Sequence, residues 1–377
     1  MLTDEGEALY NRILIKEFAK GKLPEAPISI HEPEWYDERD IDLQLNTHVT
    51  DIDPEAHASR PRRHRTTTTN SSSPGGTPTQ LPVENSDAEG IHHFWTFQDA
   101  RGIREHADEA DQGIVVGAGL LGIDLAAVRA AQEIDAKYLM RGNRWWRYAL
   151  SEEGAEIIHE ALEANVSNPS SNPASTTSKS TTTVTSPARS TPTATTTRAN
   201  GPASLSASIS TPSPQRDRAR TRRRRRRRRD MQTNVEDIYA AGDLTQFYDT
   251  ILDSQAQNGA WGSAKEQGTI AAKNMVDYGS EEFRWVSSYS ITHFDFPFLS
   301  FGHPTLGDDH VEAKYSDTEW RRLAIKDGKI VGGVLIGDLS PQTKYKQLMR
   351  EQRQVGGQKE ILGEGSRPRR SKPRTPA

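Results

Sequence analysis

The spacing of apolar positions changes period along the middle of the chain. Residues 113–116 form a continuous apolar run, which predicts a buried strand. Residues 120–134 carry apolar side chains at helical spacing and predict a helix, and residues 137–140 predict a second short strand. A strand, a helix and a strand in this order predict a βαβ unit with parallel strands.

Three other segments in the first half of the chain are periodic. Residues 4–20 place apolar side chains at near-helical spacing, which predicts a helix. Residues 40–49 contain a strictly alternating run and predict a short strand. Residues 151–164 predict another helix, whose apolar face consists of Ile157, Ile158, Ala161 and Leu162.

The second half of the chain is predicted to contain helices and a β-rich region. Residues 238–241 predict a short strand, and residues 252–277 predict a helix or a pair of helices. Residues 283–338 are β-rich, and residues 342–352 predict a final helix. Near the end of the β-rich region, Asp327-Gly328 separates two apolar runs and predicts a hairpin of strands 320–326 and 329–336.

Two segments lack the apolar residues that a core requires. Residues 59–74 are Ser-, Thr- and Arg-rich, and residues 166–229 are Ser-, Thr-, Pro- and Ala-rich and end in eight consecutive arginines. Such segments bury too little apolar surface to offset the loss of chain entropy on folding, so we predict that the longer one is disordered.

Charge is distributed unevenly between these segments and the remainder. Residues 59–74, 166–229 and 366–377 together carry a formal net charge of +22, so the rest of the chain carries −26 within a total of −4. An acidic body of this kind suggests a protein adapted to high salt, where screening weakens self-repulsion.

Composition also excludes several classes of function and location. Cysteine is absent, which excludes disulfides, thiolate metal sites and redox-active cysteine pairs within this chain. No apolar run is long enough to span a membrane, and the acidic N-terminus lacks a signal-peptide pattern. We therefore expect a cytoplasmic protein without membrane association.

The βαβ unit contains a glycine pattern that is typical of dinucleotide-binding proteins. Gly117, Gly119 and Gly122 form GxGxxG between the first strand and the helix. In such a unit, the first glycine permits the tight turn, the second lets the backbone approach a pyrophosphate, and the third lets helix and strand pack closely. The helix N-terminus adds positive charge toward the phosphates. A glycine-rich turn in another α/β protein is the alternative interpretation.

The end of the second strand indicates which nicotinamide cofactor is used. An acidic residue there usually binds the ribose 2′-hydroxyl of NAD. Here the sequence after the strand contains Arg141 and Arg144 but no carboxylate. Two arginines at this point favour a 2′-phosphate and therefore NADP over NAD. Alternatively, these arginines pair with surface carboxylates.

Three stretches together resemble the FAD-dependent pyridine-nucleotide reductases with two dinucleotide-binding domains. This family includes rubredoxin and ferredoxin reductases, NADH oxidases and the large subunit of nitrite reductase. The first stretch is the glycine motif at 117–122, and the second, residues 233–243, resembles the family's second FAD motif. The third, residues 11–16, resembles the segment whose lysine lies near the flavin N5.

The resemblance implies roles for individual residues. Gly242 and Asp243 would contact FAD, with Asp243 hydrogen-bonded to the ribityl chain. Lys16 would lie near the flavin N5 and pair with Asp124, which stands where the family usually has a glutamate; an exposed charge on the helix is the alternative for Asp124. The helix that opens near Gly262 would direct its N-terminus at the flavin O2 region. No metal site is expected.

The implied fold class is α/β: an incomplete pair of Rossmann-like FAD and NAD(P) domains with a smaller α+β C-terminal domain and a long disordered insert. The expected parts are an FAD-domain remnant, an NAD(P)-binding half-domain, a disordered segment, an FAD-domain return segment, a C-terminal domain and a basic tail. Their boundaries are 1–84, 85–165, 166–230, 231–282, 283–362 and 363–377.

The resemblance also implies FAD and NADP or NAD as cofactors, and a rubredoxin- or ferredoxin-like acceptor protein as partner. Without cysteines, the chain would not reduce disulfides by the dithiol route. Related reductases often dimerise through the C-terminal domain, so a homodimer is expected.

Two other interpretations of the chain remain open. The family's first GxGxxG, for FAD, has no counterpart before residue 11, and the Thr and Arg runs are what repeated Asp codons give when the reading frame shifts. The chain would then be a truncated, frame-shifted relative without activity. Alternatively, Arg222–Arg229 binds nucleic acid through phosphate contacts. No interleaved aromatic residues or recognised binding fold support that alternative.

Overall fold

The computed structural model describes residues 1–47, 78, 81–140, 142, 144–166, 204–206, 229–233, 235, 238–291, 297–356, 362 and 369–371. The chain forms two compact units, each assembled from separate parts of the sequence. The first unit consists of Met1–Ile13, Glu25–Thr77 and Ser210–Ser287, and the second of Leu14–Pro24, Pro78–Ile209 and Ser288–Ala377.

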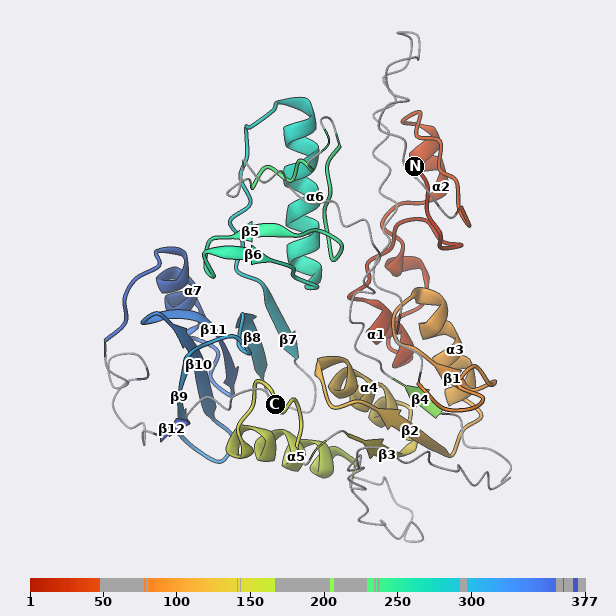
Figure 1. The fold of residues 1–377 in the computed structure, drawn as a ribbon. Helices are drawn as coiled ribbons and strands as arrows, with labels where there is room; N and C mark the ends of the chain where they lie inside the picture. The colour runs from red at the N-terminus through yellow and green to blue at the C-terminus, as the bar shows by residue number, and fades with distance from the viewer. Residues whose placement is uncertain are drawn as a thin grey trace. The chain divides into compact units, whose positions relative to one another are not determined.

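The second unit contains a small parallel sheet with the strand order β1-β4-β2-β3 (Figure 1). Strand β2 pairs with β3 in parallel, with Gly113 opposite Ala136, and helix α4 joins the two. The strands and the helix of the βαβ unit are confirmed, although α4 ends at Ala131, before the predicted end. The bounds in this part are α1 Ile15–Ala19, β1 Ile91–His92, α3 Phe97–Ala107, β2 Gln112–Val116, α4 Leu120–Ala131, β3 Asp135–Leu139, α5 Glu152–Val166 and β4 Ser204–Ser206.

Helix α3 is an element that the apolar pattern did not predict. Its start is fixed by a capping box, in which the Thr96 hydroxyl accepts a hydrogen bond from the Asp99 backbone and the Asp99 carboxylate accepts one from the Thr96 backbone. The helix packs on α1, where the rings of Phe18 and Phe97 meet edge to face at 5.1 Å. The capping-box spacing was a local signal for this helix in the sequence.

The second unit also contains an antiparallel sheet with the order β12-β9-β10-β11-β8-β7 (Figure 1). The predicted hairpin is confirmed at its predicted bounds: Asp327 and Gly328 both have positive φ, which suits the right-handed twist of the flanking strands. The bounds here are β7 Ser288–Ile291, β8 Phe298–Gly302, β9 Asp309–Lys314, β10 Trp320–Lys326, β11 Lys329–Ile336, α7 Gln342–Arg350 and β12 Arg369–Ser371.

Helix α5 packs against helix α4 and against β10 of the antiparallel sheet. Its predicted apolar face is confirmed, since Ile157, Ile158 and Leu162 are buried and Ala161 packs against the same cluster. The fully buried Trp320 of β10 lies against Gly154, where an added Cβ would come within 2.9 Å of the indole ring. The parallel and antiparallel sheets of this unit therefore share one core.

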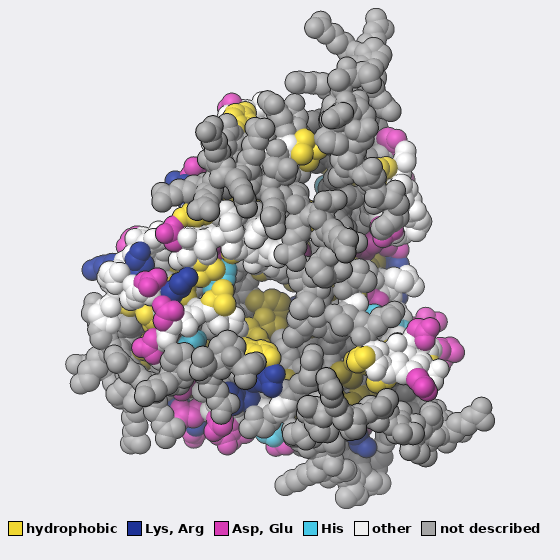
Figure 2. All heavy atoms as spheres, in the orientation of Figure 1, with side chains coloured by type: hydrophobic (Ala, Val, Ile, Leu, Met, Phe, Trp, Pro, Cys, Tyr) yellow, Lys and Arg dark blue, Asp and Glu magenta, His cyan; other side chains and the backbone are white. Residues whose placement is uncertain are grey.

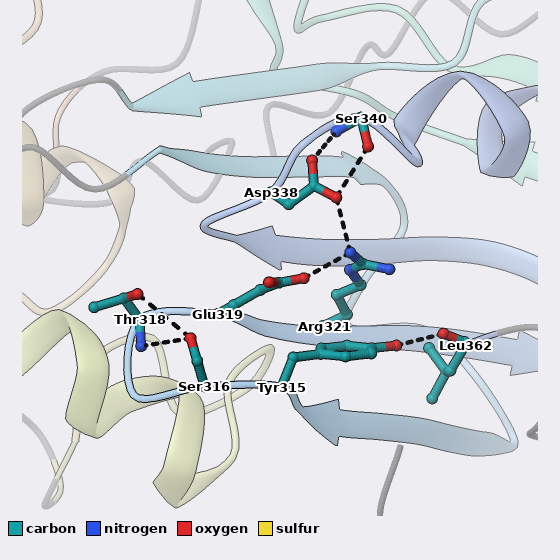
Figure 3. Close-up of polar contacts among 8 residues, drawn as sticks. All are labelled: Tyr315, Ser316, Thr318, Glu319, Arg321, Asp338, Ser340 and Leu362. Atoms are coloured by element: carbon teal, nitrogen blue, oxygen red, sulfur yellow. Dashed lines mark hydrogen bonds and ion pairs between the residues drawn. The ribbon is translucent and has the colours of Figure 1, made fainter. Parts of the chain in front are cut away.

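An ion-pair network fixes one end of the hairpin (Figure 3). Arg321 contacts Glu319 at 2.6 Å and Asp338 at 3.0 Å, and its guanidinium lies 4.4 Å from the ring centroid of Tyr315. The Tyr315 hydroxyl donates to the backbone oxygen of Leu362. This network joins the chain after β9 and the start of β10 to the loop after β11.

The first unit is built around helix α6 and a short antiparallel ribbon (Figure 1). The prediction of helix over 252–277 is wrong for its first part, because residues 254–256 pair with 247–249 and the helix begins only at Trp261. At residues 254–256, antiparallel pairing with residues 247–249 outweighs the helical spacing of the apolar residues. The bounds are η1 Ala26–Ile28 (a 3₁₀ turn), α2 Pro33–Asp37, β5 Phe247–Asp249, β6 Ser254–Ala256 and α6 Trp261–Val276.

Two N-terminal predictions are wrong, and both errors have the same cause. Within 4–20 only α1 is helical, and within 40–47 only Gln44 forms a β-bridge, with Leu2. The backbone of residues 2–10 pairs instead with two later segments, as in the Tyr10–Ser29 bridge. Long-range backbone pairing therefore overrides local periodicity here.

The predicted strand at 238–241 is also reduced to one bridge, between Tyr239 and Gln232. Residues 59–74 and most of 166–229 lie outside the described residues, as do most of 363–377. An exception in the long segment is Ser204–Ser206, which forms β4 between β1 and β2, a strand that the composition did not predict.

Acidic side chains are scattered over the described surface on the face shown in Figure 2. This distribution agrees with the acidic charge of the body, while adaptation to high salt stays a prediction. No helix among the described residues is both long and apolar enough to cross a membrane.

Candidate functional site

The glycine loop of the second unit connects β2 to α4. Gly117 has a φ of +121°, a conformation that favours glycine, and its N–H donates to the Leu139 carbonyl at 2.9 Å. At Gly122, an added Cβ would lie 2.4 Å from the Gly117 carbonyl oxygen. The first and third glycines therefore have the conformational roles that the motif requires.

The N-terminus of α4 has the properties of an anion site. Gly119 is its N-cap residue and has no side chain to cap the helix. The first N–H groups of an α-helix have no partner within the helix, and they carry partial positive charge. Residues 117, 118 and 120 are partly buried and Gly119 is buried, so the backbone on either side of Gly119 is the part of the loop that a phosphate can approach. The loop fits a dinucleotide.

The chain after β3 folds over the glycine loop, and this constrains the arginines there. The Trp146 N–H donates to the Ala118 carbonyl at 2.6 Å. Arg144 donates from Nε to the Leu150 carbonyl at 3.2 Å, and its Nη1 lies 3.8 Å from Glu152 Oε1. Arg144 therefore contacts the start of α5, and its ion pair with Glu152 agrees with the alternative interpretation that these arginines pair with carboxylates. Arg141 lies outside the described residues.

A buried charged cluster lies next to this loop, where α1, α4 and β7 meet. Lys16 Nζ of α1 lies 3.6 Å from Asp124 Oδ1 of α4, so the structure brings the two predicted residues together. The Asp124 side chain is 3% exposed and that of Lys16 is 18% exposed. The second carboxylate oxygen, Oδ2, accepts a hydrogen bond from the Tyr289 hydroxyl. The role of Lys16 and Asp124 in catalysis stays a prediction.

Electrostatics in this cluster reflect burial and close charges. Burial, followed by the charge of Asp124 and its hydrogen bond, raises the pKa of Tyr289 well above its ordinary value. Burial also lowers the pKa of Lys20, one helical turn from Lys16, although Glu17 at 2.8 Å opposes the change. Tyr289 therefore stays protonated over the neutral range and acts as a hydrogen-bond donor.

The first unit places the Gly-Asp pair beside α6. Gly242 has a φ of +87°, and its N–H donates to Gln267 Oε1 at 2.8 Å. Gln267 is fully buried and also donates to the Ser263 hydroxyl at 3.3 Å. The buried polar side of α6 therefore fixes the turn that presents Asp243.

The Asp243 carboxylate is partly buried and lies over Gly259, where an added Cβ would be 3.5 Å from Oδ2. No hydrogen bond reaches this carboxylate from any other residue that the structure describes. Burial raises the pKa of Asp243, and the charge of Arg12 partly opposes this. A partly buried acceptor of this kind fits a ligand hydroxyl, as on the ribityl chain of FAD.

The start of α6 also agrees with its predicted place. The helix begins at Trp261, with Gly262 in its first turn and no side-chain cap at Ala260. An added Cβ at Gly262 would lie 3.6 Å from the partly exposed Trp285 ring. The uncapped N–H groups provide partial positive charge for a ligand.

Sequence reasoning missed two residues of these sites. Tyr289 and Gln267 contact their partners across 165 and 25 residues of sequence, respectively. Neither lies in a motif, so no local signal identified them. Among the described residues, no group of three or more His, Asp or Glu side chains forms a metal site.

Two protein-family profiles match the sequence of this chain. The profile of the pyridine nucleotide-disulphide oxidoreductase family matches residues 1–268, and that of the rubredoxin NAD⁺ reductase C-terminal domain matches residues 291–353. The assimilatory nitrate reductase electron transfer subunit of Bacillus subtilis is 26% identical over 156 residues, which cover 41% of this chain. The match spans only 20% of that relative's length.

Solved structures share the fold at low sequence identity. The putidaredoxin reductase–putidaredoxin complex matches with a TM-score of 0.71 at 14% identity, over 94% of this chain and 87% of that chain. The NADH:rubredoxin oxidoreductase of Clostridium acetobutylicum matches with a TM-score of 0.65 at 17% identity, over 95% of this chain and 89% of that chain. These matches confirm the predicted α/β fold class of a two-dinucleotide-domain reductase.

Proposed function

Because this chain belongs to the pyridine nucleotide-disulphide oxidoreductase family, we propose that it is an FAD-dependent NAD(P)H reductase. Family membership confirms the resemblance found in the sequence, and members of this family are enzymes that bind FAD and NAD(P)H. The single observation that carries the proposal is the cluster of Lys16 and Asp124, which lies directly beside the glycine loop at Gly117–Gly122.

The second unit supplies the contacts for the nicotinamide cofactor. The turn at Gly117 and the close packing at Gly122 leave room for a pyrophosphate at the N-terminus of α4. Arg141 is a residue we propose for contact with the 2′-phosphate of NADP. Arg144 already binds Leu150 and Glu152, so a comparison of NADPH with NADH tests its part in this preference.

The first unit supplies contacts for FAD. We assign the ribityl hydroxyl to the Asp243 carboxylate, because this acceptor is partly buried and no other described residue donates to it. The helix start at Gly262 would stabilise negative charge at the flavin O2 region through its free N–H groups. Gln267 keeps this arrangement in place by holding the Gly242 turn.

Bound flavin would accept a hydride from the nicotinamide and pass electrons onward. In this reaction, Lys16 and Asp124 hold one positive and one negative charge at a fixed separation, with little access to water. A pre-organised pair of this kind stabilises charge that develops nearby without reorganising during the reaction. We propose that Lys16 faces the flavin N5 and that Asp124 orients Lys16.

The electron acceptor is constrained by composition and by the C-terminal domain. With no cysteine, this chain lacks the dithiol that disulfide reduction requires. The match to the rubredoxin NAD⁺ reductase C-terminal domain supports a small rubredoxin- or ferredoxin-like protein as acceptor. Association into a homodimer, location in the cytoplasm and activity at high salt stay predictions.

Anaerobic reduction tests the proposal. The full chain is saturated with FAD in high-salt buffer and mixed with NADPH or NADH, and the visible flavin band is followed. We expect the band to bleach, faster with NADPH, and to recover when rubredoxin or ferredoxin is added. A flavin that is bound but not bleached by either nucleotide would contradict the proposal, as would a chain that retains no flavin.

A further inference from the structure

The Asp124 carboxylate receives different interactions at its two oxygens. Lys16 Nζ lies 3.6 Å from Oδ1, beyond the usual length of a direct hydrogen bond, whereas the Tyr289 hydroxyl donates to Oδ2. Lys16 therefore contributes mainly charge, and Tyr289 contributes a directed hydrogen bond. Lys16 Nζ also lies 5.8 Å from the Tyr289 ring centroid, so the three side chains form one cluster.

Tyr289 belongs to a part of the fold that family resemblance assigns to dimerisation or partner binding. It lies on β7, the edge strand of the antiparallel sheet, opposite Ser300 of β8. Its ring packs against the core cluster shared by the two sheets of the unit. The ring is therefore held by the fold, and its hydroxyl has a fixed position beside α4.

A buried carboxylate stays ionised only if donors and cations compensate for lost hydration. The titratable groups facing Asp124 include Lys16 and Lys20 from α1 and Tyr289 from β7. Lys16 lies near one carboxylate oxygen and Tyr289 donates to the other, while Lys20 also contacts Glu17 at 2.8 Å. Removing the hydroxyl would take away the hydrogen bond that fixes the orientation of the Asp124 carboxylate relative to Lys16.

We propose that Tyr289 is a positioning residue, which holds the Asp124 carboxylate turned toward Lys16 and so makes the C-terminal sheet part of the hydride-transfer site. This inference rests on the proposed function for the effect on catalysis. The hydrogen bond itself can be tested in protein without cofactor.

The first test is the pH profile of flavin reduction by NADPH, measured by stopped flow on the full chain loaded with FAD. Tyr289→Phe should slow flavin reduction about tenfold across the pH profile, because the Asp124 carboxylate loses the hydrogen bond that turns it toward Lys16. The matched control is Tyr315→Phe, which also removes a hydrogen-bonded hydroxyl from the same sheet, on Leu362, and should leave the profile unchanged. A Tyr289→Phe profile identical to that of the wild type would overturn the proposal.

The second test follows tyrosine ionisation by ultraviolet absorption in the folded chain without FAD. The chain has ten tyrosines. Because Asp124 adds its charge and its hydrogen bond to the effect of burial on the pKa of Tyr289, we expect one tyrosine to ionise at lower pH in Asp124→Asn than in the wild type. Adding Tyr289→Phe to Asp124→Asn should remove that shifted ionisation. Equal titration of the wild type and Asp124→Asn would overturn the proposal whether or not the chain binds flavin.

Discussion

Two aspartates that we assign to cofactor sites, Asp124 in the second unit and Asp243 in the first, lie in different surroundings. Asp124 is almost fully buried and has protein partners at both oxygens, namely Lys16 and Tyr289. Asp243 is partly buried, and no described residue donates a hydrogen bond to it. The fold satisfies one carboxylate completely and leaves the other with open acceptor positions.

This difference separates two ways in which a protein prepares a site. A carboxylate with internal partners is held in place before any ligand arrives, so it can orient a neighbouring group during a reaction. A carboxylate without donors is costly in the free protein and gains its hydrogen bond only from a ligand. We therefore expect Asp124 to act on rate and Asp243 to act on cofactor retention.

The largest expected effect comes from removing the cation beside Asp124. Lys16→Met removes the ion pair in which Nζ lies 3.6 Å from the buried Asp124 carboxylate and should lower the free energy of unfolding by about 3 kcal/mol. Flavin reduction by NADPH should also slow. Urea unfolding and stopped-flow absorbance measure the two effects. Lys22→Met, at an exposed lysine nearby, is the control and should change neither. A Lys16→Met variant as stable and as fast as the control would break the assignment of Asp124 to rate.

The next effect concerns the loop that presents α4 to the nicotinamide cofactor. Gly122→Ala would place a Cβ 2.4 Å from the Gly117 carbonyl, so α4 must shift, at a cost of about 1–3 kcal/mol of stability. Binding of NADPH, measured by calorimetry, should weaken with it. Gly268→Ala is the matched control: the site in α6 is open, and alanine should stabilise the helix by about 0.5–1 kcal/mol. Equal behaviour of the two variants would contradict the close approach at Gly122.

Asp243→Asn should act mainly on FAD. Losing the charge weakens the hydrogen bond to a ligand hydroxyl, and we expect roughly tenfold weaker FAD binding, or about 1.4 kcal/mol. Fluorescence titration with FAD measures the change, and the affinity for NADPH serves as the internal control. If FAD binding is unchanged while NADPH binding falls, the assignment of Asp243 is wrong.

The smallest effect is a pH dependence of the same substitution in the cofactor-free protein. Burial raises the pKa of Asp243 in the folded state, so the folded state binds this proton more tightly than the unfolded state does. The stabilising contribution is present below the unfolded pKa and is lost as pH rises through the folded pKa. Relative to the wild type, Asp243→Asn should therefore gain stability as pH rises through the acid range. Urea unfolding at several pH values measures this stability difference. A difference between Asp243→Asn and the wild type that does not change with pH would contradict the prediction.

Local patterns predicted the parts of the molecule that local forces determine. The strand, glycine turn and helix around Gly117 follow from periodicity and from a backbone conformation that favours glycine. The hairpin at Asp327-Gly328 follows from its turn residues. The pairing of Lys16 with Asp124 came from family resemblance, because the two residues are far apart in the sequence.

The remaining features depend on contacts that the sequence pattern does not encode locally. The segment before α1 pairs with later backbone instead of forming the predicted helix, as at Tyr10 and Ser29. Tyr289 reaches Asp124 from β7 of the antiparallel sheet, across 165 residues of sequence. Gln267 lies on the buried polar side of α6, and no sequence motif marks that position. Tertiary structure decides each of these.

The most direct test of the central claim is the absorption spectrum of the full chain after incubation with FAD and removal of free cofactor by gel filtration in high-salt buffer. Our account predicts a yellow protein with one FAD per chain, and an Asp243→Asn variant that retains less. A colourless wild-type protein that is folded by circular dichroism would contradict the account, because it would show that these residues do not form a flavin site.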